Sequence, residues 1–192
     1  MLDLYLSDQN ERKSQGLPPL PLNAEQTVSL VELLKKDSAK DPDLLLSLLE
    51  KRVPAGVDQA AFVKAAFLTD LAKNNAHSPY IVDDHAIKLL GTMLGGYNVQ
   101  SLIALLDTDK AEQATKALSK ITLIFDAFYD VEKLHKNGNI YATNLIKSWA
   151  EAEWFTSKNA IPETLKVKIF KVDGETNTDD LSPAQDAWSR AD

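Results

Sequence analysis

The sequence contains no cysteine, and this absence excludes several kinds of chemistry. Without thiols the chain offers no disulfide, no thiolate nucleophile, no structural zinc site of the usual type and no local ligands for an iron–sulfur cluster. It also lacks an apolar run of roughly 20 residues, the length that a membrane-spanning helix needs. Residues 1–4 begin neither a basic segment nor an apolar stretch, so we expect no secretory signal, no membrane association and a cytoplasmic location.

Positive charge is also scarce, because 21 Lys and Arg face 28 Asp and Glu, which gives a net charge of −7 over 192 residues. Phosphate binding depends on Lys and Arg that displace counterions, so the negative net charge disfavours broad nonspecific binding to nucleic acid. Two local lysine clusters lie within residues 35–40 and 166–171. Each is also expected of the solvated side of an amphipathic element, which is the simpler interpretation.

What the chain does have is helical periodicity, from its start to about residue 157. Asn23 with Gln26 three residues later is the pattern of a capping box, and Asp41-Pro42 places an N-cap before a proline in the first helical position. Gly95-Gly96 is typical of a helix stop. We expect about nine helices, over residues 3–13, 24–34, 42–49, 59–72, 83–94, 98–106, 109–119, 121–136 and 139–156.

The connections between these helices are short, so neighbouring helices are expected to pair as helix-turn-helix units. This pattern favours an α-solenoid over an up-and-down bundle, although the units differ in length and show no clean sequence repeat. The predicted fold class is therefore all-α.

The periodicity changes after Ile161-Pro162. In residues 165–172 apolar residues alternate with Lys166 and Lys168, which predicts a strand with one wet face and a bulge near its end. One strand does not fold alone, so it is expected to dock on the helices, pair with another chain or belong to a larger domain. We therefore divide the chain into a helical domain, 1–157, and a β-containing segment, 158–192, that begins a second domain.

Carboxylates and a histidine in the helical domain have spacings that suggest chemistry. Glu132 and His135 match the Glu-x-x-His spacing of di-iron bundles, but such sites require a second pair and further carboxylates, which the sequence lacks. Asp126 and Asp130 lie four residues apart among aromatic residues and could form an acid pair, but the solvent-exposed side of an aromatic core helix is the simpler interpretation. We expect no metal site and no catalytic residue here.

Other candidates in the helical domain also have simpler interpretations. Residues 91–96 superficially resemble a phosphate-binding loop, but they lack the Lys-Ser/Thr pair and a preceding strand, so a helix stop is the better interpretation. His77 and His85 have no cysteine or clustered histidine nearby. Trp149 and Trp154 are expected to be core or interface anchors.

Residues 174–190 form the densest polar motif, with carboxylates, hydroxyls, an amide and a guanidinium. Such a set is the material of a site for a polyanion or polar substrate, but a turn-rich linker has a similar composition. Composition alone leaves both interpretations open.

Residues 174–184 and 186–190 resemble a segment near the start of the catalytic portion of the bacterial aconitase B family, also called aconitate hydratase 2. Further strings resemble the same family in order and spacing over residues 20–23, 31–35, 52–54, 89–93, 95–98, 128–132 and 148–155. The resemblance spans essentially the whole chain.

The resemblance implies a HEAT-like α-solenoid followed by the truncated beginning of a swivel domain. Enzymes of this family interconvert citrate and isocitrate through cis-aconitate, and many also act as 2-methylisocitrate dehydratases, with a [4Fe-4S] cluster as the Lewis acid. The arginine of the family's Trp-Ser-Arg string contacts a substrate carboxylate, which assigns a tricarboxylate-binding role to Arg190. The family's cluster ligands lie downstream and are absent here, so no cofactor is expected in this chain.

Two functions follow as expectations. The first is an N-terminal protein-interaction domain of the tricarboxylic acid cycle enzyme, which forms a homodimer or docks a partner protein through the helical domain and is not catalytic by itself. The alternative is a regulatory module of the apo-enzyme that binds messenger RNA, which the acidic balance makes the weaker candidate.

Overall fold

The computed structural model describes residues 2–178, and these contain ten α-helices, two short 3-10 helices and no strand. The all-α prediction is thus confirmed for this part of the chain. The α-helices are α1 (Leu2–Ser14), α2 (Ala24–Leu34), α3 (Pro42–Lys51), α4 (Gln59–Ala72), α5 (Asp83–Leu90), α6 (Val99–Ala104), α7 (Ala111–Leu118), α8 (Phe128–Lys136), α9 (Ile140–Ala150) and α10 (Glu153–Thr156).

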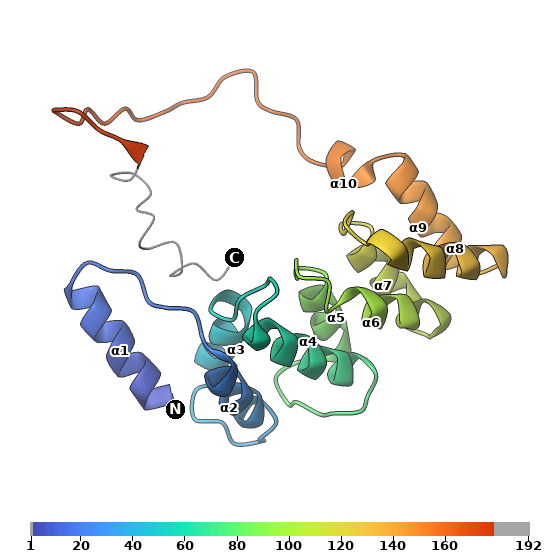
Figure 1. Ribbon diagram of the computed structural model, residues 1–192, viewed down its shortest axis with the longest axis horizontal. Helices are drawn as coiled ribbons and strands as arrows, with labels where there is room; N and C mark the ends of the chain where they lie inside the picture. Colours follow the sequence, from blue (N-terminus) through green and yellow to red (C-terminus); the bar gives the residue numbers. More distant parts are fainter. Residues whose placement is uncertain (1, 179–192) are drawn as a thin grey trace.

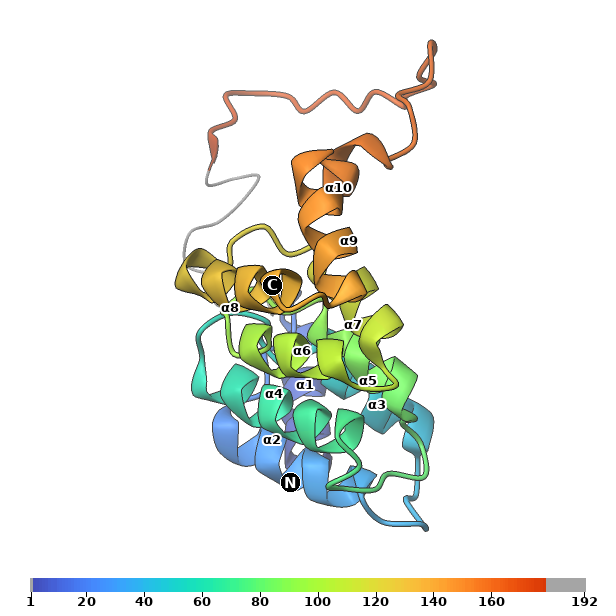
Figure 2. The same ribbon diagram turned by 90° about the vertical axis from the view of Figure 1, so that its right-hand side faces the viewer.

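The helices form a stack whose order follows the sequence. Figure 1 shows α1 at one end and α8 to α10 at the other, and in Figure 2 α2, α4, α6 and α8 lie above one another in successive layers. The closest packing joins α4 to α5 and α2 to α4, and further along α7 contacts both α5 and α9. Among the described residues, no helix has the length and apolar character needed to cross a membrane. The HEAT-like assignment of this stack stays a prediction.

The helix starts predicted from capping residues are formed. The Oδ1 of Asn23 accepts from the Gln26 amide at 2.8 Å, and the Gln26 side chain accepts from the Asn23 amide at 3.0 Å, which completes the capping box. Asp41 likewise accepts from the Leu44 amide at 3.1 Å, with proline next to it in the first helical position. These caps satisfy amides that have no partner inside a helix.

Two lysines lie inside the otherwise apolar core. Lys110 is buried, and its Nζ donates to the Ala72 carbonyl at 2.7 Å and forms an ion pair with Asp83 at 2.8 Å, so it ties together the ends of α4, α5 and α7. The Lys110 hydrogen bond keeps the pKa of Asp83 below its usual value. Lys64, in the middle of α4, is only 2% exposed.

Several of the expected helices are shorter or broken, including the helix expected over 83–94, which ends at Leu90. The helix expected over 139–156 ends at Ala150, because Ala152 adopts a left-handed conformation with φ of 52°, and the four-residue α10 follows it. The helix expected from residue 121 begins only at Phe128, after a 3-10 turn in which Phe125 has φ of 46°. Both breaks change the chain direction and lie at the same end of the stack.

Residues 91–96 end α5 and pack against the loop after α3. The Leu94 amide donates to the Ala55 carbonyl at 2.7 Å, and a Cβ on Gly95 would lie 2.0 Å from the Gly56 carbonyl oxygen. Glycine at Gly95 therefore allows two backbones to touch, and the loop's interpretation as a helix stop is consistent with this packing. Asn98 follows with its amide buried, and it donates to the Leu90 carbonyl at 2.6 Å.

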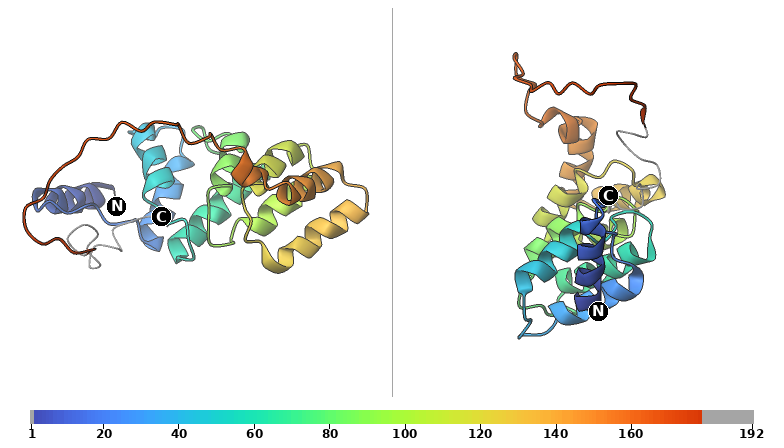
Figure 3. Two further views of the ribbon diagram at one scale, coloured as in Figure 1. Left: turned by 90° about the horizontal axis from the view of Figure 1, so that it is seen from above. Right: turned by 90° about the vertical axis from the view of Figure 1, so that its left-hand side faces the viewer.

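Residues 159–177 leave the helices as an extended segment that arches away from the stack (Figures 1 and 3). The strand predicted over 165–172 is not formed, and its side chains are exposed. A strand needs a partner to bond its backbone groups, and the described residues offer none. The division into domains 1–157 and 158–192 thus stays a prediction.

Candidate docking surface

Exposed aromatic side chains gather at the C-terminal end of the stack, where α8, α9 and α10 adjoin one another. We call this surface the aromatic end, and it consists of Phe125, Phe128, Tyr129, Trp154 and Phe155. The exposed fraction reaches 81% for Phe125 and 62% for Phe155. Phe125 lies in the 3-10 turn before α8, and Phe155 lies in α10, after the break at Ala152. The structure departs from the predicted helices at both places.

Trp149 connects the aromatic end to the core. Its indole Nε1 donates to the Leu118 carbonyl at 3.2 Å, and its ring lies 6.3 Å from that of Phe128. On the outer side, the ring of Trp154 lies 5.8 Å from that of Phe155. The structure therefore places Trp149 partly in the core and Trp154 on the surface. The core role predicted for Trp149 is consistent with this, and an interface role for Trp154 stays a prediction.

The exposure of the aromatic end is energetically unfavourable. An aromatic side chain covers 150–250 Å² when buried, and each buried Å² of apolar surface contributes about 25 cal/mol. Covering one such ring would therefore contribute several kcal/mol before entropic costs. Exposed aromatic side chains are often found at interaction sites.

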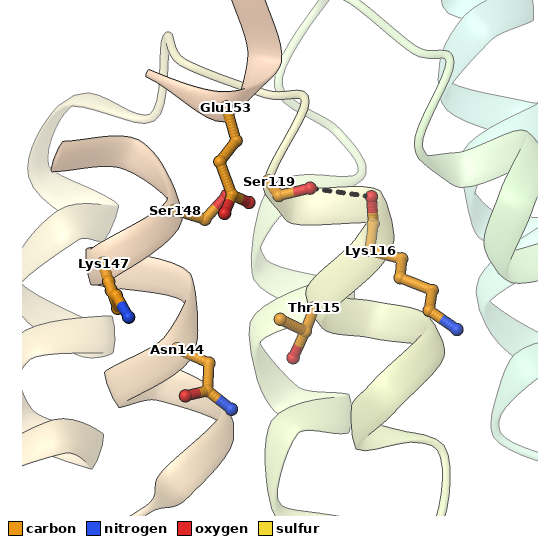
Figure 4. Close-up of a pocket in the computed structure, with 7 residues that line it drawn as sticks. All are labelled: Thr115, Lys116, Ser119, Asn144, Lys147, Ser148 and Glu153. Carbon is orange, nitrogen blue, oxygen red and sulfur yellow. Dashed lines mark hydrogen bonds between the residues drawn. The ribbon is translucent and has the colours of Figure 1, made fainter. Parts of the chain in front are cut away.

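A polar pocket of about 300 Å³ opens beside the aromatic end, between α7 and α9 (Figure 4). In Figure 4 Thr115 on one side lies opposite Asn144 on the other, the Ser119 hydroxyl points toward the Lys116 carbonyl, and Glu153 from α10 lies above Ser148. The lining residues are Thr115, Lys116, Ser119, Asn144, Lys147, Ser148 and Glu153.

Most of the polar and charged side chains that line this pocket already have hydrogen-bond or ion-pair partners. The buried Ser148 hydroxyl donates to Glu153 Oε2 at 2.6 Å. The two lysines of the pocket are engaged elsewhere, since Lys116 pairs with Glu112 at 2.6 Å and Lys147 with Glu151 at 3.8 Å. The hydrogen bond between Lys116 and Glu112 lowers the pKa of the glutamate and raises that of the lysine. Within residues 2–178, Glu153 makes no ion pair.

Arg190, the predicted tricarboxylate contact, lies outside the described residues, as does most of the polar motif 174–190. The described part of that motif, residues 174–178, is exposed. The predicted substrate-binding role of Arg190 stays a prediction.

Several of the carboxylates and histidines named from the sequence have ordinary partners. Glu132 pairs with Lys136 at 2.8 Å, while the neighbouring His135 Nδ1 lies 2.8 Å from the Thr143 hydroxyl. Asp130 accepts from Gln100 at 2.8 Å. In the part of the chain that the structure describes, no three His, Cys, Asp or Glu side chains come together as a metal site would require.

His85 Nε2 lies 3.0 Å from Glu50 Oε1, and both side chains are partly exposed.

The pocket was not predicted from the sequence. Ser148 and Glu153 are five residues apart, a spacing that does not bring side chains together on a continuous helix. They meet only because the chain turns at Ala152. For the aromatic end a signal did exist, because residues 121–129 contain more large apolar residues than one face of a helix can bury.

The described residues define an all-α domain with an exposed aromatic end. Residues 4–155 match the family model described as the aconitate B N-terminal domain, and residues 167–192 match the aconitate hydratase 2 N-terminus. The chain belongs to the aconitate hydratase B family and corresponds to its N-terminal region.

Relatives match along the whole chain. It is 55% identical over 193 residues to aconitate hydratase B of Escherichia coli K12 and 52% identical over 193 residues to that of Pseudomonas aeruginosa. The corresponding protein of Synechocystis is 53% identical over 195 residues. All of this chain is covered in each comparison, but it spans only 22% of the length of these relatives.

The [4Fe-4S] cluster implied by the family does not fit the residues present. Such clusters are held by cysteine thiolates, and the chain has no cysteine. No step of a mechanism is therefore assigned to a cluster in this chain.

Proposed function

We propose that this chain is the protein-interaction part of an aconitate hydratase B and that it associates with a second copy or a partner protein through the aromatic end. The exposed rings of Phe125, Trp154 and Phe155 carry this proposal. Trp154 and Phe155 lie in α10, just before the extended segment, and Phe125 lies in the 3-10 turn before α8. Exposed aromatic side chains are suited to association.

The chemistry of the family would reside in a longer chain. The conversion of citrate to isocitrate through cis-aconitate requires a cluster, which the residues here do not fit. Arg190 would supply one guanidinium for a substrate carboxylate, with two parallel hydrogen bonds. We therefore infer that the 192-residue chain has no aconitase activity, which an assay for cis-aconitate formation from citrate tests directly.

Association through the aromatic end is tested by light scattering of the purified chain over a concentration series, alone and mixed with the E. coli relative. We expect a concentration-dependent increase in mass, or a mixed complex, that the double variant Phe125→Ser/Phe155→Ser loses. The matched control is Val57→Ser/Leu94→Ser, which removes equally exposed apolar side chains from the loops after α3 and α5. A chain that stays monomeric and binds no relative would overturn the proposal, as would equal losses in both double variants.

Binding of messenger RNA is the alternative. The chain carries a net charge of −7, and the pocket lysines Lys116 and Lys147 are paired with glutamates. These features weaken electrostatic attraction to phosphates. Retardation of RNA that declines steeply with salt would support the alternative over the docking proposal.

A further inference from the structure

We propose that the junction between α9 and α10 is a two-state hinge, which sets the direction in which residues 159–177 leave the stack. The structure contains the bent form, in which the chain breaks at Ala152. In the second, straight form α9 continues without interruption through Thr156. The hinge does not rest on the proposed function, because it concerns the course of the chain and not the surface that a partner binds.

The break lies in a segment whose sequence favours a continuous helix. Residues 139–161 contain no glycine and no proline. Residues 150–153 are Ala-Glu-Ala-Glu, and alanine and glutamate are among the strongest helix formers. The local sequence therefore supports the straight form. A disagreement between local preference and observed structure is expected mainly at functional or strained sites.

The bent form also requires an unfavourable backbone conformation. Ala152 has φ of 52° and ψ of 38°, in the left-handed region, where the Cβ comes too close to the following carbonyl oxygen. Helices that end in a left-handed residue usually have glycine at that position, because glycine has no Cβ. With alanine there, the backbone by itself does not favour the bend.

One side-chain hydrogen bond offsets this cost. The Ser148 hydroxyl donates to Glu153 Oε2 at 2.6 Å across the break. On a continuous helix two residues at this spacing point about 140° apart around the axis, so the straight form loses the bond. A bond to a charged group and a left-handed alanine make contributions of similar size and opposite sign to the stability of the bend. The two forms are therefore close in free energy.

Little else holds α10 in place. Within the described residues its only substantial packing is on α9, and the rings of Trp154 and Phe155 are exposed. A segment with few buried contacts opens at low free-energy cost. Straightening moves α10 and the start of the extended segment together, while the body of α9 keeps its contacts with α7 and α8.

The test measures the distance across the hinge in the full 192-residue chain. Because the sequence has no cysteine, Lys120→Cys/Lys158→Cys accepts spin labels at these two exposed positions alone, one after α7 and one after α10. Double electron–electron resonance then gives the distribution of distances between the labels. We expect two populations. The coupling between the amide proton and the Hα of Ala152 assigns them, because φ is positive in the bent form and about −63° in a continuous helix.

Two variants should shift the populations in opposite directions. Ser148→Ala removes the bond across the break and should raise the ratio of straight to bent chains roughly tenfold. Ala152→Gly relieves the left-handed residue and weakens a continuous helix, so it should lower that ratio roughly tenfold. The matched control is Ser119→Ala at the end of α7, where the hydroxyl donates to the Lys116 carbonyl at 3.1 Å. It should leave the ratio unchanged.

A single distance population in the parent chain and in every variant would overturn the inference. Equal effects of Ser148→Ala and Ser119→Ala, or shifts of both hinge variants in the same direction, would do so too. Straightening raises the helical circular dichroism, so a fall in Ser148→Ala would mean that the end of α9 unfolds there. In that case Ala152→Gly decides alone, because it must deplete a second population that the parent chain shows. A parent chain with one population would then overturn the hinge.

Discussion

Replacement of Lys64 by methionine is expected to stabilise the protein strongly at neutral pH. Lys64 is 2% exposed and lies in the middle of α4. Burial lowers the pKa of its ammonium from 10.5 to about 8, against a smaller opposing influence of Glu50. No hydrogen bond from Lys64 occurs within the described residues, so the folded protein carries a poorly compensated buried charge.

The size of the effect follows from the change in proton affinity. Each tenfold change corresponds to about 1.4 kcal/mol, so lowering the pKa from 10.5 to about 8 destabilises the folded state by about 3 kcal/mol. Because the folded pKa is depressed, this cost is fully present below pH 8 and disappears as the pH rises toward 10.5. Methionine has a similar length and no charge, so Lys64→Met should remove the cost without leaving a cavity.

Urea unfolding followed by circular dichroism, repeated from pH 6 to pH 10.5, measures the difference between Lys64→Met and the parent chain. We expect the free energy of unfolding of Lys64→Met to exceed that of the parent chain by about 3 kcal/mol at pH 7. Above pH 8 this difference should decline, until only the smaller difference between burying a neutral amine and burying a thioether is left. Lys73→Met, at the exposed end of the same helix, should change stability by less than about 0.5 kcal/mol at every pH. A gain that does not vary with pH, or a loss at pH 7, would refute the reasoning.

Two further substitutions, each with a control substitution, test the backbone conformation and packing at Gly95 and Ala152. Gly95→Ala should cost about 3 kcal/mol, because the new Cβ would meet the Gly56 backbone at 2.0 Å and separate the loops that the Leu94 amide joins. Gly56→Ala, whose Cβ would meet nothing nearer than 3.8 Å, should cost far less in the same urea assay, and similar costs would contradict the contact. Ala152→Gly should raise the melting temperature through a gain of about 0.5–1 kcal/mol, since φ is 52° there, while Ala150→Gly in α9 should lower it. A loss in both would show that Ala152 is not strained.

Local sequence patterns predicted those features that local forces determine. The capping box at Asn23 and the Asp41-Pro42 start form as expected, because a cap involves residues only three positions apart. Asn139 also caps α9, by accepting from the Ala142 amide at 2.8 Å. Asp58 stands at the N-cap position of α4, but its side chain makes no cap hydrogen bond.

Features that depend on tertiary contacts could not be predicted. The helical pattern of residues 139–156 gives no sign of a break, yet Ser148 and Glu153 favour one by bonding across the turn at Ala152. Lys64 occupies a helix position that a charge pattern assigns to solvent, and only the packing of α2 and α5 on α4 places it in the interior. The pocket depends on the same break, so its residues could be assigned only from the structure.

The two ends of the stack differ in a way that supports an interface at the C-terminal end. At the N-terminal end the α1 residue Tyr5 is buried and donates to the Leu20 carbonyl at 3.0 Å, and Arg52 donates to the Pro19 carbonyl beside it. At the C-terminal end nothing in residues 2–178 covers Phe125 or Phe155. Exposed aromatic rings are enriched at interfaces, so these two rings are the observation that supports the proposed interface at this end.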